Sequence, residues 1–132
     1  MLAYMLDTNI CIYVMKAYPP ALRERFNAAA EQLCISSITL GELHYGAEKS
    51  ARRNSNLLAI EHFTARLEVL PFTAGAAVHH GQIRTELERL GRPVGVYDML
   101  IAAHARSEGL VVVTNNMREF ARTPGLRVEN WV

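Results

Sequence analysis

The chain has 132 residues, of which 50% are hydrophobic and 20% are charged, and its formal net charge at pH 7 is +1. This length predicts one domain, residues 1–132, that buries a core without disulfides or structural metals, and the composition excludes a disordered chain. The apolar runs are far shorter than the ~20 residues of a membrane span, and Asp7 interrupts the first of them, so we expect no signal peptide. We expect a cytoplasmic protein in which Cys11 and Cys34 are buried free thiols, although the two could also pair.

The predicted elements alternate between apolar strands and amphipathic helices. In chain order they are a strand at 2–6, a helix beginning near Asn9, a helix at 21–31, a strand at 33–35, helices at 39–49 and 54–66, a strand at 69–70, helices at 73–90 and 97–108, and strands at 110–113 and 127–131. Gly91 is expected to end the helix at 73–90. Strands that are apolar throughout and separated by helices indicate an α/β fold with a parallel sheet covered on both faces.

Polar residues follow two of these strands directly. Asp7, one of two aspartates beside eleven glutamates, follows the first strand, and Thr114-Asn115-Asn116 follows the strand at 110–113. Ligand sites of parallel α/β sheets lie beyond the carboxyl ends of the strands. We therefore expect these two segments to lie at one edge of the sheet. Glu42, Asp98 and Glu119 are predicted near helix starts and are expected to converge on the same edge.

Each acid also has a purely structural interpretation as part of a helix cap. Asp7 and Asp98 stand where an N-cap is expected, and the segments Thr39 to Glu42 and Asn116 to Glu119 each have the pattern of a capping box. Together, however, the four acids would repel one another. Two charges ~5 Å apart cost about 3 kcal/mol at an effective dielectric constant of ~20, and a divalent cation removes that cost.

The kinds of side chain available favour a hard cation over zinc. The sequence contains no HExxH, CxxC or glycine-rich phosphate loop, and its five histidines form no zinc pattern. Mg²⁺ and Mn²⁺ prefer oxygen ligands such as carboxylates. A carboxylate-bound Mg²⁺ suits hydrolysis of a phosphodiester, because the metal lowers the pKa of a water and stabilises the attacking and leaving oxygens.

Four ordered motifs resemble one known family. They are "MLDTN" at 5–9, the glutamate of "ISSITLGELHYGAEKS" at 35–50, "GRPVGVYDMLIAAHA" at 91–105 and "LVVVTNNMREF" at 110–120, and they look like the PIN-domain toxins of bacterial VapBC toxin–antitoxin pairs. The resemblance extends from residue 2 to the closing "VENWV". It implies a PIN-domain-like three-layer α/β/α sandwich around a small, mainly parallel sheet of four or five strands.

The resemblance also implies a function. Members of the family are Mg²⁺-dependent endoribonucleases, with Mn²⁺ as a possible substitute, and each is neutralised by a VapB-type antitoxin. They usually form homodimers, so a heterotetramer or a larger complex with the antitoxin is expected. Several similar members cut tRNA in the anticodon loop, some of them the initiator tRNA, and tRNA is therefore the expected substrate.

By position, Asp7, Glu42 and Asp98 match the metal-binding and catalytic acids of the family. Many members have a further aspartate where this chain has Asn116, so either Asn116 or Glu119 fills the fourth position. The number of metal ions stays open as well. The residues expected to orient the carboxylates are Thr8, Asn9, Thr114 and Asn116.

Arginine provides twelve of the fourteen basic residues, and its guanidinium suits bidentate contact with phosphate, although a bias in genome composition would produce the same count. The candidates for contact with RNA phosphates are Arg84, Arg92 and Arg118. A phosphoacceptor receiver domain is disfavoured, because Asp7 has no acidic neighbour and no lysine follows Lys49. The remaining alternative is a PIN-like RNA- or protein-binding module without catalysis, which would be expected to lose one of the three acids that this chain keeps.

Overall fold

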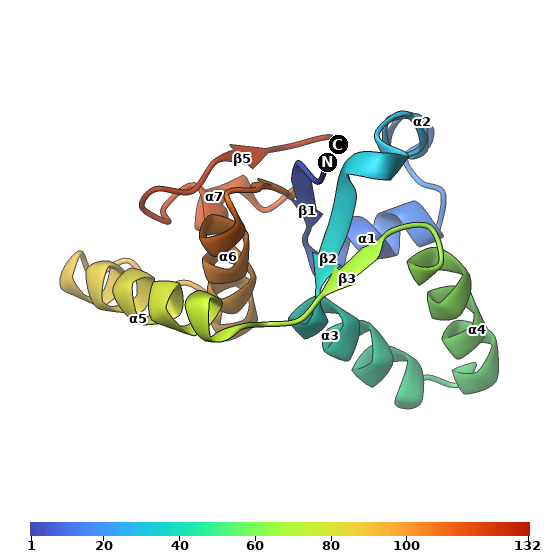
Figure 1. Cartoon of the computed structure of the whole chain (residues 1–132). Helices are drawn as coiled ribbons and strands as arrows, with labels where there is room; N and C mark the ends of the chain where they lie inside the picture. The colour runs from blue at the N-terminus through green and yellow to red at the C-terminus, as the bar shows by residue number, and fades with distance from the viewer.

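The computed structural model describes residues 1–132 and is built around one five-stranded sheet (Figure 1). All strand pairs are parallel, and the strand order is β3-β2-β1-β4-β5. The strands are β1 (Tyr4–Leu6), β2 (Leu33–Ser36), β3 (Glu68–Leu70), β4 (Val111–Val113) and β5 (Val128–Glu129). The helices are α1 (Thr8–Met15), α2 (Pro20–Ala28), α3 (Ser37–Glu48), α4 (Arg53–Thr64), α5 (Ala74–Arg89), α6 (Val96–Glu108) and α7 (Met117–Phe120), with a 3₁₀ turn at Ala30–Gln32.

Adjacent residues of each central strand contribute to different cores, because side chains of a strand alternate between the two faces of the sheet. Leu6, Ile35 and Val113 belong to a buried cluster with residues of α1, α2, α3 and α4. Met5 and Val112 belong to a second cluster with α6 and α7. The sheet is thus covered on both faces, which confirms the predicted three-layer α/β/α sandwich.

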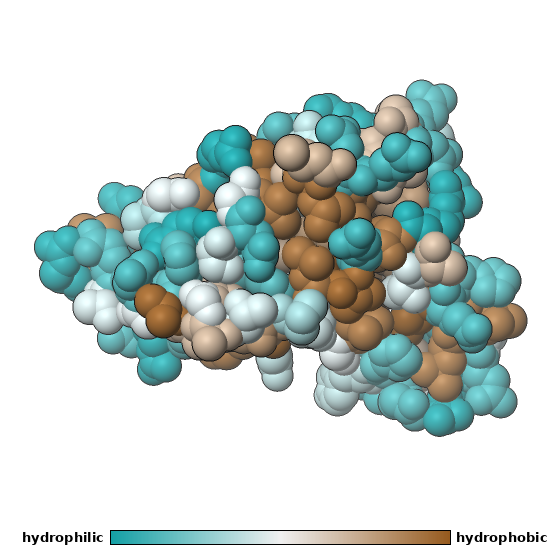
Figure 2. Space-filling model, viewed as in Figure 1, coloured by the Kyte–Doolittle hydropathy of each residue, from teal (hydrophilic) through white to brown (hydrophobic).

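Helix α5 lies outside the second layer and packs against α6 through Ile83, Leu87 and Ala103. Figure 1 shows α5 and α6 on one side of the sheet and α1, α3 and α4 on the other. In the same view, hydrophobic residues gather over the middle of the sheet, between the two groups of helices, and hydrophilic residues cover the free end of α5 (Figure 2). No helix has both the length and the apolar character needed to span a bilayer.

Several boundary predictions are confirmed. Asp7 is the N-cap of α1, and Gly91 follows the end of α5 with a φ of 64°, a left-handed conformation that glycine adopts without strain. Cys11 and Cys34 are free and buried. The predicted helix at 21–31 is shorter, because α2 ends at Ala28 and a 3₁₀ turn follows.

Three of the capping interpretations are wrong. Helix α3 begins at Ser37, two residues earlier than predicted, because the Ser36 hydroxyl accepts a hydrogen bond from the backbone N–H of Ile38 at 3.0 Å. Glu42 therefore lies in the second turn of α3 and is not part of a capping box. Gly95, not Asp98, is the N-cap of α6, and Asn116 makes no side-chain capping bond at the start of α7.

The topology places one crevice at the carboxyl ends of β1 and β4. From β1 the chain passes to β2 and β3 on one side, then returns through α5 and α6 to β4 on the other side. The loops after β1 and β4 consequently lead in different directions, and such a switch point is where parallel α/β sheets bind ligands. The backbone N–H of Asp7 donates to the carbonyl of Val113 at 3.0 Å, which fixes the two strand ends together.

Candidate active site

The carboxylate of Asp7 sits between the ends of β1 and β4. Its Oδ1 accepts a hydrogen bond from the backbone N–H of Ile10 at 2.8 Å, and its Oδ2 accepts one from the Thr114 hydroxyl at 2.5 Å. The residue is 2% exposed. Asp7 thus caps α1 and is also fixed by β4, so the capping interpretation is confirmed without excluding a role at the site.

Burial, rather than neighbouring charge, dominates the titration of Asp7. Removal from water raises the pKa of Asp7 from 3.8 to about 6, the hydrogen bonds from Thr114 and Ile10 oppose that shift, and the charge of Glu42 adds to it. No basic side chain compensates this charge, because none of the four ion pairs in the structure includes Asp7, Glu42, Asp98 or Glu119.

Glu42 is oriented by Thr8, which lies in the first turn of α1. The Thr8 hydroxyl donates to Oε1 of Glu42 at 2.6 Å and lies 3.3 Å from the hydroxyl of Thr39. Thr39 is buried on α3, so the three side chains join the start of α1 to the first turns of α3. The hydrogen bond to Glu42 is consistent with the predicted orienting role of Thr8. Thr39 is a further neighbour of the Thr8 hydroxyl, and the sequence pattern did not predict it.

Asp98 and Glu119 form a coupled pair on α6 and α7. The side-chain amide of Asn116 donates to Oδ2 of Asp98 at 3.3 Å and to Oε2 of Glu119 at 3.4 Å. Burial raises the pKa of Asp98 from 3.8 to about 7, and a hydrogen bond with Glu119 and the charge of that residue add to the shift. The same hydrogen bond lowers the pKa of Glu119. The pKa values of the two carboxyl groups are therefore shifted in opposite directions, upward for Asp98 and downward for Glu119.

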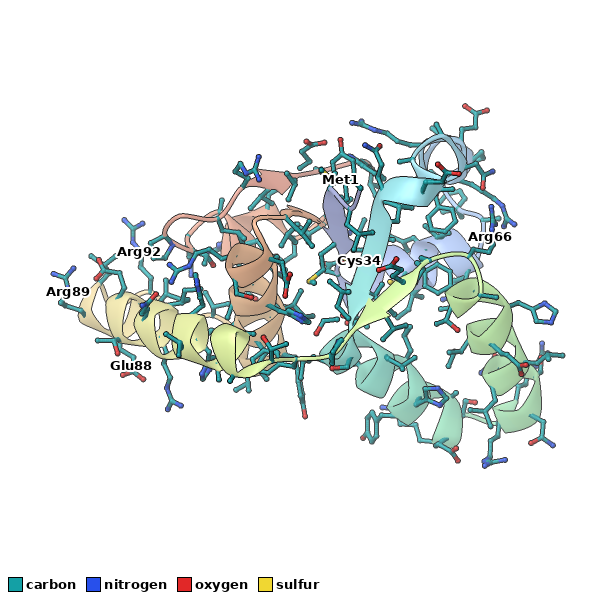
Figure 3. All side chains as sticks on the ribbon, viewed as in Figure 1. Met1, Cys34, Arg66, Glu88, Arg89 and Arg92 are labelled. Carbon is teal, nitrogen blue, oxygen red and sulfur yellow. The ribbon has the colours of Figure 1, made fainter.

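The structure brings together most, but not all, of the predicted residues. Asn9 is exposed on α1 and makes no side-chain hydrogen bond, whereas Thr114 accepts a further bond from the backbone N–H of Asn116 at 2.8 Å. Arg84 and Arg92 line one cleft of about 450 Å³ beside the end of α5, where Arg84 pairs with Glu88 at 3.2 Å. Figure 3 shows Arg92 over α5. Arg118 is exposed on α7.

The acids form separate groups instead of one closed cage. No three of the Asp, Glu, His and Cys side chains lie close enough together to hold one ion among them. The charges of Asp7 and Glu42 nevertheless contribute to the raised pKa of Asp98, which places all three within electrostatic reach of one another. Oxygen donors without a basic partner fit Mg²⁺, which keeps several waters and needs only one or two carboxylates, and they do not fit a tetrahedral zinc cage.

The chain is similar to known proteins over almost its whole length. The PIN domain family model matches residues 4–126. Over 131 residues the chain is 60% identical to the tRNA(fMet)-specific endonuclease VapC of Salmonella typhimurium, with 99% of each chain covered. It is 53% identical to Ribonuclease VapC2 of Haemophilus influenzae over 132 residues, with 100% of both covered.

Solved structures agree with the sequence relatives. The chain matches one from DNA-bound VapBC of Salmonella typhimurium with a TM-score of 0.96 and 59% identity, covering 100% of both chains. A chain from VapBC2 of Rickettsia felis bound to a promoter DNA fragment matches with a TM-score of 0.94 and 41% identity, covering 99% of this chain and 100% of that one. By its sheet, its acidic edge and its full-length relatives, the chain belongs to the PIN-domain family and, within it, to the VapC proteins.

Proposed function

We propose that this protein is the toxin of a VapBC toxin–antitoxin system and an endoribonuclease that cuts tRNA, with the initiator tRNA(fMet) as its substrate. The observation that supports this proposal best is the arrangement at the β1–β4 edge, where the charges of Asp7 and Glu42 act on Asp98 and none of the three acids forms an ion pair with a basic side chain. Support for the substrate comes from a relative of 60% identity that is named for this tRNA.

We further propose that the activity depends on Mg²⁺, with Mn²⁺ able to replace it. Asp7 and Asp98 would hold the ion, with Glu42 as the third acid and either Asn116 or Glu119 in the fourth position. When bound, such a cation activates a water and stabilises the attacking and leaving oxygens of a phosphodiester.

The side chains around these acids act by positioning them. Thr114 and the N–H of Ile10 hold the carboxylate of Asp7 in one orientation, and Thr8 does the same for Glu42. The side-chain amide of Asn116 donates to both Asp98 and Glu119 and so holds the two carboxyl groups next to each other. The site is therefore arranged before an ion or RNA arrives.

A VapB-type antitoxin, RNA and a second copy of the chain are the partners in this proposal, with the cytoplasm as the place of action. The solved relatives from Salmonella typhimurium and Rickettsia felis are VapBC complexes on DNA. The chain itself is compatible with a homodimer that binds antitoxin as a heterotetramer or a larger assembly.

The test is cleavage of a purified tRNA pool by the purified toxin with Mg²⁺, with Mn²⁺ and with EDTA. We expect discrete cuts in tRNA(fMet) with either metal and none in EDTA. Asp98→Asn should abolish cleavage and relieve the growth arrest caused by expression without antitoxin, while the exposed-acid control Glu61→Gln should cut normally. Tight tRNA binding without cleavage under all conditions would instead establish a non-catalytic binding module.

A further inference from the structure

A wide groove beside Glu42 has no role in the function proposed above. It runs along α3 to the first turn of α6, has a volume of about 730 Å³, and includes Thr8 and Glu42 in its wall. Cavities of about 300–1,000 Å³ are typical of sites for small organic groups. The groove therefore continues directly from the candidate active site and is large enough for a nucleotide.

Two tyrosines line this groove from different elements. Tyr45 on α3 is 66% exposed, and Tyr97 on α6 is 56% exposed. The ammonium group of Lys49 lies 4.6 Å from the centre of the Tyr45 ring and also lines the groove. Exposed aromatic faces next to a cation are the combination with which proteins bind unpaired bases and their phosphates.

The same wall contains two glycines inside a helix. Gly41 and Gly46 lie in the interior of α3, where glycine destabilises a helix relative to alanine. A Cβ atom built at either position meets no atom within 4 Å. No packing within the chain therefore requires these glycines, and their effect is to widen the groove next to Tyr45.

We propose that this groove binds a nucleobase of single-stranded RNA next to the cleaved phosphodiester. Tyr45 and Tyr97 stack on unpaired bases, and Lys49 contacts the adjoining phosphate. This inference rests on the proposed ribonuclease function, because Thr8 and Glu42 link the groove to the acids. A protein occupant is disfavoured because the charged side chains of Glu42 and Lys49 line the groove beside the tyrosines, whereas the centre of a stable protein interface is depleted of charged residues.

The first experiment compares RNA cleavage by the parent and by the double variant Tyr45→Ala/Tyr97→Ala. Base–aromatic stacking is strong enough that we expect KM for tRNA to rise about 10-fold or more, with kcat changed much less. Tyr45→Phe/Tyr97→Phe keeps the rings and should restore KM. Tyr18→Ala, which removes a tyrosine of 72% exposure outside this groove, is the matched control and should match the parent.

A base-free substrate separates this inference from the proposed function. Metal-dependent cleavage of a synthetic RNA whose sugars next to the cleaved phosphodiester carry no bases should be equal in the parent and the tyrosine variants. A parent that cuts neither this RNA nor tRNA would overturn the proposed function. A parent that cuts tRNA, with an unchanged KM in Tyr45→Ala/Tyr97→Ala, would overturn only the base-binding groove.

The glycines provide a second test that does not depend on losing a side chain. Gly46→Ala should raise the melting temperature, because alanine favours a helix, and should at the same time raise KM for tRNA about 3-fold or more by narrowing the groove. Gly81→Ala in α5 is the matched control, since its Cβ also meets nothing within 4 Å, and it should stabilise without changing KM. If Gly46→Ala alters the oligomeric state or antitoxin binding while KM is unchanged, the groove is a protein interface and the inference is wrong.

Discussion

The hydroxyl of Thr114 donates a hydrogen bond to Oδ2 of Asp7, and this contact links the residues that follow β4 and β1, which are 107 positions apart in the chain. The carboxylate is thereby held in the crevice where the chain changes direction across the sheet. Both residues are buried, so the bond lies away from solvent.

Thr114→Val should destabilise the protein by about 1–3 kcal/mol at pH 8, since it leaves a buried carboxylate oxygen without its donor. The Thr114 bond lowers the pKa of Asp7, so its loss raises that pKa further above about 6. A raised carboxyl pKa costs stability only where the group is ionised, so the loss should be smaller at pH 5. Urea unfolding at the two pH values measures this difference. The control is Thr85→Val on the exposed face of α5, and an equal loss at both pH values would contradict the prediction.

Asp98→Asn should stabilise the metal-free protein at pH 8 and have almost no effect on its stability near pH 3, below the ordinary pKa of 3.8. The folded pKa of Asp98 is about 7, above its ordinary value of 3.8, so the parent loses stability as the pH rises between these two values. The amide is neutral throughout and avoids this loss, which we place at about 1–2 kcal/mol after allowance for solvent screening. Thermal melting in EDTA tests the prediction. A lower melting temperature for the variant than for the parent at pH 8 would contradict it, because it would show that the Asp98 carboxylate stabilises the folded protein.

Millimolar Mg²⁺ should raise the melting temperature of the parent and have little effect on Asp7→Asn. A ligand that binds only the folded state stabilises it by mass action, and loss of one carboxylate charge removes most of that affinity. Asparagine remains a good N-cap, so α1 is retained. The control Glu88→Gln changes an exposed acid on α5 and should respond to Mg²⁺ as the parent does. Equal shifts in all three proteins would mean that Asp7 does not contribute to a metal site.

Alanine at Arg84, Arg92 and Arg118 together should lower the salt dependence of tRNA binding. Each lost phosphate contact reduces the slope of log K against log salt concentration by ~0.7–0.9, so the full set predicts a reduction of about 2. Binding is measured in EDTA to prevent cleavage. The control is Arg53→Ala, which removes an arginine paired with Glu48 and should leave the slope unchanged. A triple variant with the slope of the parent would exclude these arginines from the RNA interface.

The sequence alone was sufficient for the layered α/β fold and for the neighbouring positions of Asp7 and Thr114. Both follow from local patterns, since strand and helix periodicity depends on nearby residues and parallel strands deliver their ends to one edge. The predicted start of α3 at Thr39 is two residues too late. Local sequence does not separate the possible caps, because Ser36 is a good N-cap residue and the segment Thr39 to Glu42 also has the pattern of a capping box. Ser36 forms the actual cap and thereby puts Glu42 in the second turn.

Only the tertiary structure decided which distant side chains meet. The bond between Thr8 and Glu42 spans 34 positions, and it depends on how α1 packs against α3. The raised pKa of Asp98 depends mainly on burial, which no single segment specifies. The groove between Tyr45 and Tyr97 likewise exists only because α3 and α6 begin at the same edge of the sheet. Local sequence determines the elements through short-range interactions, whereas these contacts arise from packing between elements far apart in the chain.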